Sequence, residues 1–204
     1  MDEAFRIIET FGWWPGAGAR RLERHLARMA RTARVLGVAW DAGAARRMTD
    51  RVAGTEPLRC RLTLDRRGRF ALDVAPLGPA AAGWRVDIAP DRLCSGDRWL
   101  RMKTTRRALY DRARATLPPG VDERLFLNEH GHLCEGAITS LFVDCGQGLL
   151  TPPLSDGLLP GILREELLRA GRAREAHLTP DDLGRARAIF VGNSLRGLIP
   201  ARRV

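Results

Sequence analysis

The residue best suited to covalent chemistry in this sequence is Lys103. It is the only lysine among 34 basic residues, and all the others are arginines. Arginine can replace lysine wherever only a positive charge is needed, but a guanidinium cannot form an imine with an aldehyde. A chain that uses arginine almost everywhere should keep a lysine where amine chemistry is required. Lys103 is therefore a candidate Schiff-base lysine, activated by burial and by nearby cations such as Arg101, Arg106 and Arg107. The alternative is an ordinary surface lysine.

Glu135 is a second residue whose type does not fit its surroundings. It lies inside the apolar run LCEGAITSLFV, which has the composition of a strand. A carboxylate is costly to bury unless another group pairs with it. Glu135 is therefore a candidate for a functional pairing. The alternative is an edge position at which the side chain faces water.

A possible anion site lies in the segment PPLSDGLLPGILREELLR, where a Pro-Gly pair begins a helix. The exposed amides of Gly161, Ile162 and Leu163 would form a phosphate-accepting helix N-terminus. The pattern alone is weak, since many helices begin in this way. Arg28 and His25 lie one turn apart beside an apolar helical stripe. From the residues alone, a solvated Arg28 and a His25 held by a local hydrogen bond are the simpler interpretations.

The first half of the chain has the pattern of an α+β lobe with antiparallel strands. Strands and helices are expected in the order strand, helix, helix, hairpin, strand, at residues 4–9, 22–37, 41–52, 58–65 with 70–74, and 84–89. Asp41 is the expected N-cap of the second helix. Strict alternation in the hairpin places Arg61 on its polar face. Arg61 faces solvent there, or it binds a substrate carboxylate with its forked donors.

The second half positions the candidate residues. Lys103 would precede a helix at about 104–116, and a meander of strands carrying Glu135 would follow from about residue 123. The last elements are the helix that begins at Gly161, one more buried strand, and the polar turn that contains Ser194. No linker composition separates the halves, and we place the boundary between a smaller lobe, 1–95, and a larger lobe, 96–204.

The net charge of +10 raises the possibility of a nucleic-acid binder. The arginines, however, are scattered among 24 acidic residues without an aromatic stacking motif, so no nucleic-acid partner is expected. The sequence shows no secretory signal and no run long enough to span a bilayer, which indicates a cytoplasmic protein. Its four cysteines include no CxxC pair and are expected to be reduced thiols, and no metal is expected.

Five stretches, from HLAR to GNSLRGLIPA, together resemble the class IV pyridoxal-phosphate aminotransferases, a fold-type IV family. HLAR resembles the family's His-x-x-Arg, which implies that Arg28 holds the cofactor phosphate. MKTTRRALYDRA resembles the segment with the Schiff-base lysine, here Lys103. LCEGAITSLFV implies that Glu135 bonds the pyridine nitrogen. TPPLSDGLLPGILR resembles the phosphate-binding turn and helix, with the amides of Ile162 and Leu163, and the last stretch implies that the Ser194 hydroxyl joins them.

Within the family, KTTRR, LLPGILR and NSLRG resemble the aminodeoxychorismate lyase branch most. The resemblance implies an α+β enzyme with a smaller α/β lobe and a larger lobe built on a barrel-like sheet, acting on a small amino substrate. The alternative within the family is an amino acid transaminase of the branched-chain or D-amino acid type. The resemblance also implies a homodimer. Two features depart from the family: Ser140 replaces its usual Asn, and no Tyr stands five residues after Lys103, which counts mildly against a transaminase.

Overall fold

The computed structural model describes residues 5–79 and 82–204. The chain divides into two compact units, Met1–Pro79 with Met102–Arg106, and Ala80–Arg101 with Arg107–Val204. This division differs from the boundary expected after residue 95, because residues 82–95 belong to the second unit and the segment around Lys103 belongs to the first.

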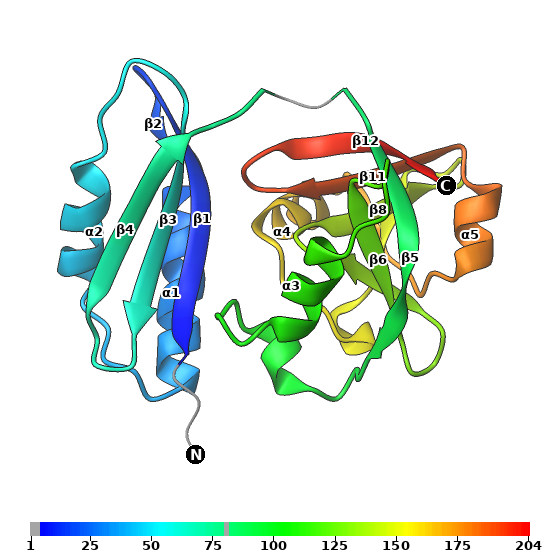
Figure 1. Cartoon of the computed structure of the whole chain (residues 1–204), viewed down its shortest axis with the longest axis horizontal. Coiled ribbons are helices and arrows are strands. Elements are labelled where there is room, and N and C mark those ends of the chain that lie inside the picture. The colour runs from blue at the N-terminus through cyan, green and yellow to red at the C-terminus, as the bar shows by residue number, and fades with distance from the viewer. Residues whose placement is uncertain (1–4, 80–81) are drawn as a thin grey trace. The chain divides into compact units, whose positions relative to one another are not determined.

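The first unit holds an antiparallel sheet, and its described strands run in the order β2-β1-β3-β4. Their bounds are Arg6–Trp14 for β1, Gly18–Ala19 for β2, Leu58–Asp65 for β3 and Phe70–Pro76 for β4. Helices α1 (Leu22–Val35) and α2 (Ala42–Asp50) cover one face of this sheet (Figure 1). The alternating apolar side chains of β3 pack against the apolar stripe of α1, which confirms the expected hairpin and helix.

The sequence predicted the start of α2 correctly but placed the end of β1 too early. Asp41 caps α2 as expected, since its Oδ1 accepts a hydrogen bond from the Ala44 amide at 2.9 Å. Strand β1 runs past the expected end at residue 9, because Phe11 and Trp13 continue its pairing with β3. Residues 15–17, which include Pro15 and Gly16, form a turn after Trp14.

The second unit is built on a barrel. Its strands are β5 (Trp84–Leu93), β6 (Glu123–Asn128), β7 (Leu133–Gly136), β8 (Ser140–Asp144), β9 (Leu149–Thr151), β10 (Ala173–Glu175), β11 (Ala188–Asn193) and β12 (Gly197–Arg203). The order β8-β11-β12-β5-β6-β7 closes into a ring, because Glu135 of β7 pairs with Ser140 of β8. The expected α+β class with a barrel-like larger lobe is confirmed.

Helices and short turns complete the second unit. The helices are α3 (Ala108–Ala115), α4 (Ile162–Arg169) and α5 (Pro180–Arg185), and 3-10 turns occur at Arg98–Arg101 and Leu154–Asp156. Helix α3 begins four residues later than expected. The reason is that the residues just before α3 belong to the first unit, where Thr104 forms a β-bridge with Ile7 of β1.

Two expectations about strands were wrong. The strand at 84–89 was expected to extend the antiparallel first lobe, but β5 pairs in parallel with β6 and β12 of the barrel. Apolar alternation identifies a strand and not its partner. The last residues were expected to form a turn after one strand, whereas Gly197–Arg203 forms β12, antiparallel to β11.

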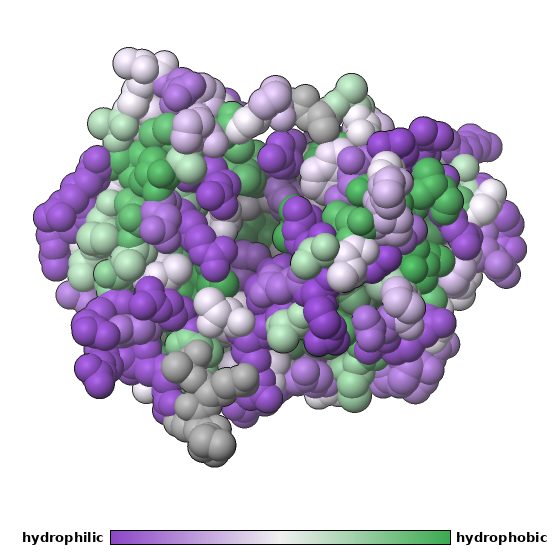
Figure 2. All heavy atoms as spheres, viewed as in Figure 1, coloured by the Kyte–Doolittle hydropathy of each residue, from purple (hydrophilic) through white to green (hydrophobic). Residues whose placement is uncertain are grey.

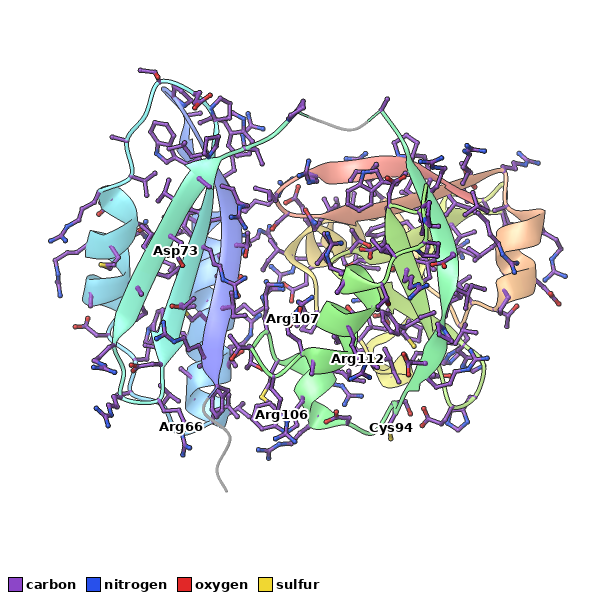
Figure 3. The ribbon with its side chains drawn as sticks, viewed as in Figure 1. Arg66, Asp73, Cys94, Arg106, Arg107 and Arg112 are labelled. Carbon is purple, nitrogen blue, oxygen red and sulfur yellow. The ribbon has the colours of Figure 1, made fainter. Side chains whose placement is uncertain are left out.

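Figure 2 shows hydrophilic residues spread over the visible face of both units, with hydrophobic residues interspersed. Within the described residues, no helix combines the length and the apolar character that crossing a bilayer would require. The four cysteines are free thiols, of which Cys94 (Figure 3) and Cys145 are exposed.

Candidate active site

The first unit buries Arg28 against a carboxylate that the sequence did not single out. The Nε and Nη2 groups of Arg28 donate to the two oxygens of Glu9 at 2.8 and 2.7 Å. His25 Nδ1 lies 2.6 Å from Glu9 Oε2. Arg28 is 5% exposed and Glu9 1%. Arg28 is therefore not a solvated side chain, and its guanidinium is fixed by a two-pronged ion pair.

Glu9 stays ionised in this setting. Burial by itself would raise its pKa, but the charge and hydrogen bonds of Arg28, followed by those of His25, lower it from 4.5 to about 2. Glu9 lies on β1 opposite Leu62 of β3 and points to the face that α1 covers. Sequence reasoning treated its segment only as a strand. A buried acid between Ile8 and Thr10 was the signal that could have identified it.

Lys103 lies on a short segment that the first unit holds beside β1. Its carbonyl accepts a hydrogen bond from the Ile8 amide at 2.9 Å, and the Thr105 amide donates to the Arg6 carbonyl at 2.8 Å. The Lys103 residue itself is half-buried. The backbone on both sides of the lysine is thus fixed to a central strand, which limits where its amine can reach.

Two of the arginines expected to activate Lys103 have other partners. Arg101 Nη2 donates to the carbonyls of Ser95 and Leu154. Arg107, at the N-terminus of α3 (Figure 3), donates to Asp111 at 2.9 Å and to the Ala137 carbonyl at 2.8 Å. Both arginines belong to the second unit, where these bonds hold its loops together.

Arg61 lies on β3 and is half-exposed. It stands opposite Thr10 of β1 and Asp73 of β4 (Figure 3), whereas its neighbour Leu62 points into the core beneath the helices. Arg61 is therefore on the sheet face away from α1 and α2. Its assignment to a substrate carboxylate stays a prediction.

Glu135 is buried in the second unit and has two hydrogen-bond donors. The Tyr110 hydroxyl donates to Oε1 at 2.6 Å, and the Leu159 amide donates to Oε2 at 3.2 Å. The residue is 7% exposed, so the alternative of an edge position facing water is wrong. Donors to both oxygens fix the plane of the carboxylate and favour its ionised form.

Tyr110 is a second partner of a candidate site residue that the sequence did not single out, after Glu9. It is the only tyrosine in the chain and stands seven residues after Lys103. Burial raises the pKa of its phenol far above the ordinary value, and the charge of Glu135 raises that pKa further. Tyr110 therefore stays protonated as a donor. The sequence comparison considered only the position five residues after Lys103, and Tyr110 stands two residues further on.

The groups of the second unit that were expected to bind a phosphate lie on α4 and directly after β11. Gly161 is the N-cap of α4, and no side chain caps the helix there. A Cβ atom on Gly161 would lie 2.5 Å from Ser140 Oγ, and one on Gly192 would lie 2.9 Å from Leu163 Cδ2. The start of α4 thus packs directly against β8 and against the end of β11.

Ser194 lies in the turn between β11 and β12, which Asn193 shapes. The Asn193 side-chain oxygen accepts hydrogen bonds from the amides of Leu195 and Arg196 at 3.1 and 3.0 Å. Ser194 thus follows the end of β11, where Gly192 packs against Leu163. The assignment of Ile162, Leu163 and Ser194 to a phosphate site stays a prediction.

Glu123 is another buried acid, and it has a structural role. It accepts hydrogen bonds from the amides of Ala137 and Ile138 and from the Thr139 hydroxyl, at 3.0–3.2 Å. Burial raises the pKa of Glu123 above its usual value. The Glu123 carboxylate holds the tight turn between β7 and β8, and thereby the end of the strand that carries Glu135.

The first unit also contains an open pocket of about 590 Å³. It lies among β1, α1 and α2, and its lining includes Trp13, Arg24 and Arg46. Arg28 and Lys103 are not part of this lining. The candidate site is therefore identified by the chemical types and contacts of its residues, and not by the volume of this pocket.

Comparison with known families decides the classification. The family model for amino-transferase class IV matches residues 6–204. The chain belongs to the amino-transferase class IV family. It is therefore an enzyme of a pyridoxal-phosphate-dependent family with the fold-type IV architecture, as the five sequence stretches implied.

Relatives in the class IV family carry two different names. A solved structure from Mesorhizobium loti, provisionally named an amino-acid aminotransferase, is 47% identical, with a TM-score of 0.91 over 98% of this chain and 100% of that one. A Schizosaccharomyces pombe protein provisionally named aminodeoxychorismate lyase is 27% identical over 86% of this chain and 80% of its own length.

The branched-chain-amino-acid aminotransferase of Escherichia coli is 30% identical over 90 residues. That alignment includes 42% of this chain and 29% of the relative, so the match covers less than a third of that enzyme. The class IV family is thus shown, and the particular reaction is not resolved between lyase and aminotransferase.

The residues present fit pyridoxal phosphate. Glu135 is a buried, doubly hydrogen-bonded carboxylate suited to a pyridine nitrogen. The uncapped start of α4 offers the amides of Ile162 and Leu163 to a phosphate, and glycine at positions 161 and 192 allows the close packing that holds this helix start in place. An imine-forming amine is supplied only by Lys103 among the side chains of the sequence.

Proposed function

We propose that this chain is a pyridoxal-phosphate-dependent 4-amino-4-deoxychorismate lyase, which forms 4-aminobenzoate and pyruvate for folate synthesis. The observation that carries the choice is the extent of the two alignments. The relative named for the lyase aligns over 86% of the chain, whereas the Escherichia coli branched-chain enzyme aligns over 42%. The resemblance of KTTRR, LLPGILR and NSLRG to the lyase branch supports the same choice.

The proposal gives each candidate residue a role toward the cofactor. Lys103 would hold it covalently, and the Glu135 carboxylate would keep a proton on its pyridine nitrogen. Tyr110 and the Leu159 amide orient that carboxylate. The amides of Ile162 and Leu163, the Ser194 hydroxyl and the Arg28 guanidinium would bind the phosphate, with Glu9 fixing Arg28.

Pyridoxal phosphate supplies an electron sink for the carbon that bears the substrate's amino group. The Lys103 amine would be the base that removes the proton from that carbon. The bond to the enolpyruvyl oxygen then breaks, and the ring becomes aromatic. The removed proton balances the one that pyruvate gains at its methyl carbon, so neither water nor a second keto acid is consumed.

Turnover of 4-amino-4-deoxychorismate tests this proposal. Purified protein supplied with pyridoxal phosphate should release 4-aminobenzoate and pyruvate in equal amounts without an added keto acid. Lys103→Arg keeps the charge and cannot form the imine, so it should abolish turnover and prevent borohydride from fixing the cofactor to the chain. Arg112→Lys, a change at an exposed position of α3 that has no role in the proposed site, is the matched control and should leave both unchanged. Failure of the wild type to bind the cofactor would refute the proposal.

An amino acid transaminase is the second candidate, because the 47% identical Mesorhizobium loti structure is provisionally named an amino-acid aminotransferase. In that case Lys103 would return the proton to the cofactor, and an added keto acid would be required. Keto-acid-dependent amino transfer faster than pyruvate release from aminodeoxychorismate would favour this candidate. Arg61, as a binder of the substrate carboxylate, belongs to either proposal.

A further inference from the structure

The second unit contains a cluster of nitrogen and oxygen donors that the proposed reaction does not use. His132 immediately precedes β7, Asp156 ends a 3-10 turn, and His177 lies between β10 and α5. One donor atom from each residue lies within 4.8 Å of the other two. Three loops that are distant in the sequence therefore bring two imidazoles and one carboxylate together.

Both imidazoles face the same carboxylate. His177 Nδ1 lies 2.8 and 3.0 Å from the two carboxylate oxygens of Asp156, and His132 Nδ1 lies 3.3 Å from Oδ1. The two rings are 4.8 Å apart between centroids and are tilted by 39°. The side chain of Asp156 is 4% exposed, whereas those of His132 and His177 are 32% and 58% exposed. The cluster is thus closed on the side of Asp156 and open to solvent on the side of His177.

The surrounding fold fixes Asp156 in place. Its carbonyl accepts hydrogen bonds from the Asn128 side-chain amide and the Cys134 thiol, both at 3.1 Å. Its amide donates to the Pro153 carbonyl at 3.0 Å. The backbone is held on both sides, so the carboxylate is directed at the imidazoles before any ligand arrives. Such preorganisation lowers the cost of binding.

The donor set matches the preferences of one class of cation. Zinc bonds of roughly 2.0–2.2 Å in a tetrahedral site place neighbouring donors roughly 3.3–3.5 Å apart. The pair of His132 and Asp156 already has this spacing at 3.3 Å, and the exposed His177 needs to withdraw by about half an ångström. Imidazole suits Zn²⁺, Co²⁺ and Ni²⁺, whereas Mg²⁺ and Ca²⁺ prefer oxygen ligands.

We propose that His132, Asp156 and His177 form a binding site for a divalent transition metal of the Zn²⁺ type, with a fourth position open to water. The sequence predicted no metal, because its four cysteines include no CxxC pair. The site does not depend on the proposed reaction. A bound ion would tie together the three loops, including the turn that leads to Leu159 and its hydrogen bond with Glu135.

Titration with Co²⁺, followed by its visible absorption, tests the site in chelator-treated protein that has been reloaded with pyridoxal phosphate and desalted. We expect one Co²⁺ per chain with the spectrum of tetrahedral nitrogen and oxygen ligation, displaced by Zn²⁺ and unaffected by Mg²⁺. His177→Gln should weaken binding by more than the roughly 10- to 100-fold that loss of an outer-shell partner costs. His132→Gln should do the same.

His130→Gln is the matched control. His130 is exposed and its ring centroid lies 6.3 Å from that of His132, but it is not one of the converging donors. The control should bind Co²⁺ as the wild type does. Because Asp156 is buried, Asp156→Asn could unfold the chain, so the two histidine variants carry the test and circular dichroism verifies that they fold.

The proposal is overturned if the wild type binds no Co²⁺, because the cluster is then only a hydrogen-bonded group. It is also overturned if His177→Gln and His132→Gln bind as the wild type does, since the metal would then occupy exposed thiols or His130. Failure of lyase activity with Co²⁺ binding intact would refute the proposed function and leave the metal site standing.

Discussion

At the scale of single residues, the buried carboxylates differ in what they hold. Glu9 holds Arg28 in a two-pronged ion pair, Glu123 holds a backbone turn, and Glu135 accepts from Tyr110. Glu135 is buried, and the Tyr110 hydroxyl and the Leu159 amide each bond one of its two oxygens, which fixes the plane of the carboxylate. Glu135 therefore stays the candidate partner of a cofactor nitrogen.

Tyr110→Phe should lower turnover and stability together. The change removes the hydroxyl that donates to Glu135 but keeps the ring, which packs edge-on against Phe126 at 5.0 Å between centroids. A hydrogen bond to a charged group contributes about 1.5–3 kcal/mol. The loss should appear as a decrease of that size in the free energy of unfolding and as a lower kcat, measured with denaturant and by steady-state kinetics. Unchanged kcat would show that Tyr110 does not support Glu135 in the reaction.

Glu9→Gln should destabilise the chain by about 3–5 kcal/mol, because Arg28 would be left as a buried charge without its counter-ion. The same ion pair sets a pH dependence. The folded-state pKa of Glu9 is about 2, below its unfolded value of 4.5. Its contribution to stability is therefore complete above pH 4.5 and is lost as the pH falls toward about 2.

Denaturant unfolding across that pH range measures the effect of Glu9. Glu56→Gln, a change at an exposed position, is the control and should follow the wild-type curve. The Glu9→Gln variant should lose less stability than the wild type between pH 4.5 and 2. A variant curve parallel to that of the wild type would contradict the ion-pair assignment.

At the scale of elements, tight turns set the positions of the site groups. The turn at Leu154–Asp156 ends at Gly157, whose φ is +85°, and leads to Leu159 and the start of α4. A Cβ atom on Gly157 would lie 2.6 Å from the Ser95 Cα atom. This close approach holds the turn against the loop after β5, and so positions the amide that bonds Glu135.

Gly157→Ala should therefore lower the free energy of unfolding by more than its unfavourable backbone angle alone would. Gly171→Ala is the matched control, since Gly171 has φ +65° and nothing within 4 Å of an added Cβ. The control should lose about 1–2 kcal/mol from the left-handed conformation. Gly157→Ala should lose more, because backbone must also shift. Equal losses in the free energy of unfolding would show that the contact with Ser95 does not constrain the turn.

At the scale of the whole molecule, the chain joins an antiparallel sheet with two helices to a closed barrel. Closure removes the free edges of the six strands in the ring, as β7 pairs back to β8, whereas β9 and β10 continue the sheet outside the ring. The class IV resemblance further implies a homodimer. We expect sedimentation equilibrium to give twice the 22.6 kDa mass of one chain. A monomer that turns over aminodeoxychorismate at full rate would contradict this expectation.

The sequence by itself determined the chemistry available and much of the local structure. A solitary lysine, a glutamate within an apolar run and a Pro-Gly helix start identified Lys103, Glu135 and the first residues of α4. Alternation and N-cap type identified the hairpin and α2. These features depend on residue type and short-range spacing, which a single sequence displays directly.

Only the tertiary structure decided which distant residues meet. It placed Glu9 against Arg28, Tyr110 against Glu135, and His132 beside Asp156 and His177. It also assigned β5 to the barrel through parallel pairing. Contacts between residues far apart in sequence depend on how strands pair and loops converge. No local pattern records that information, because the same strand can pair with several partners until the whole sheet is closed.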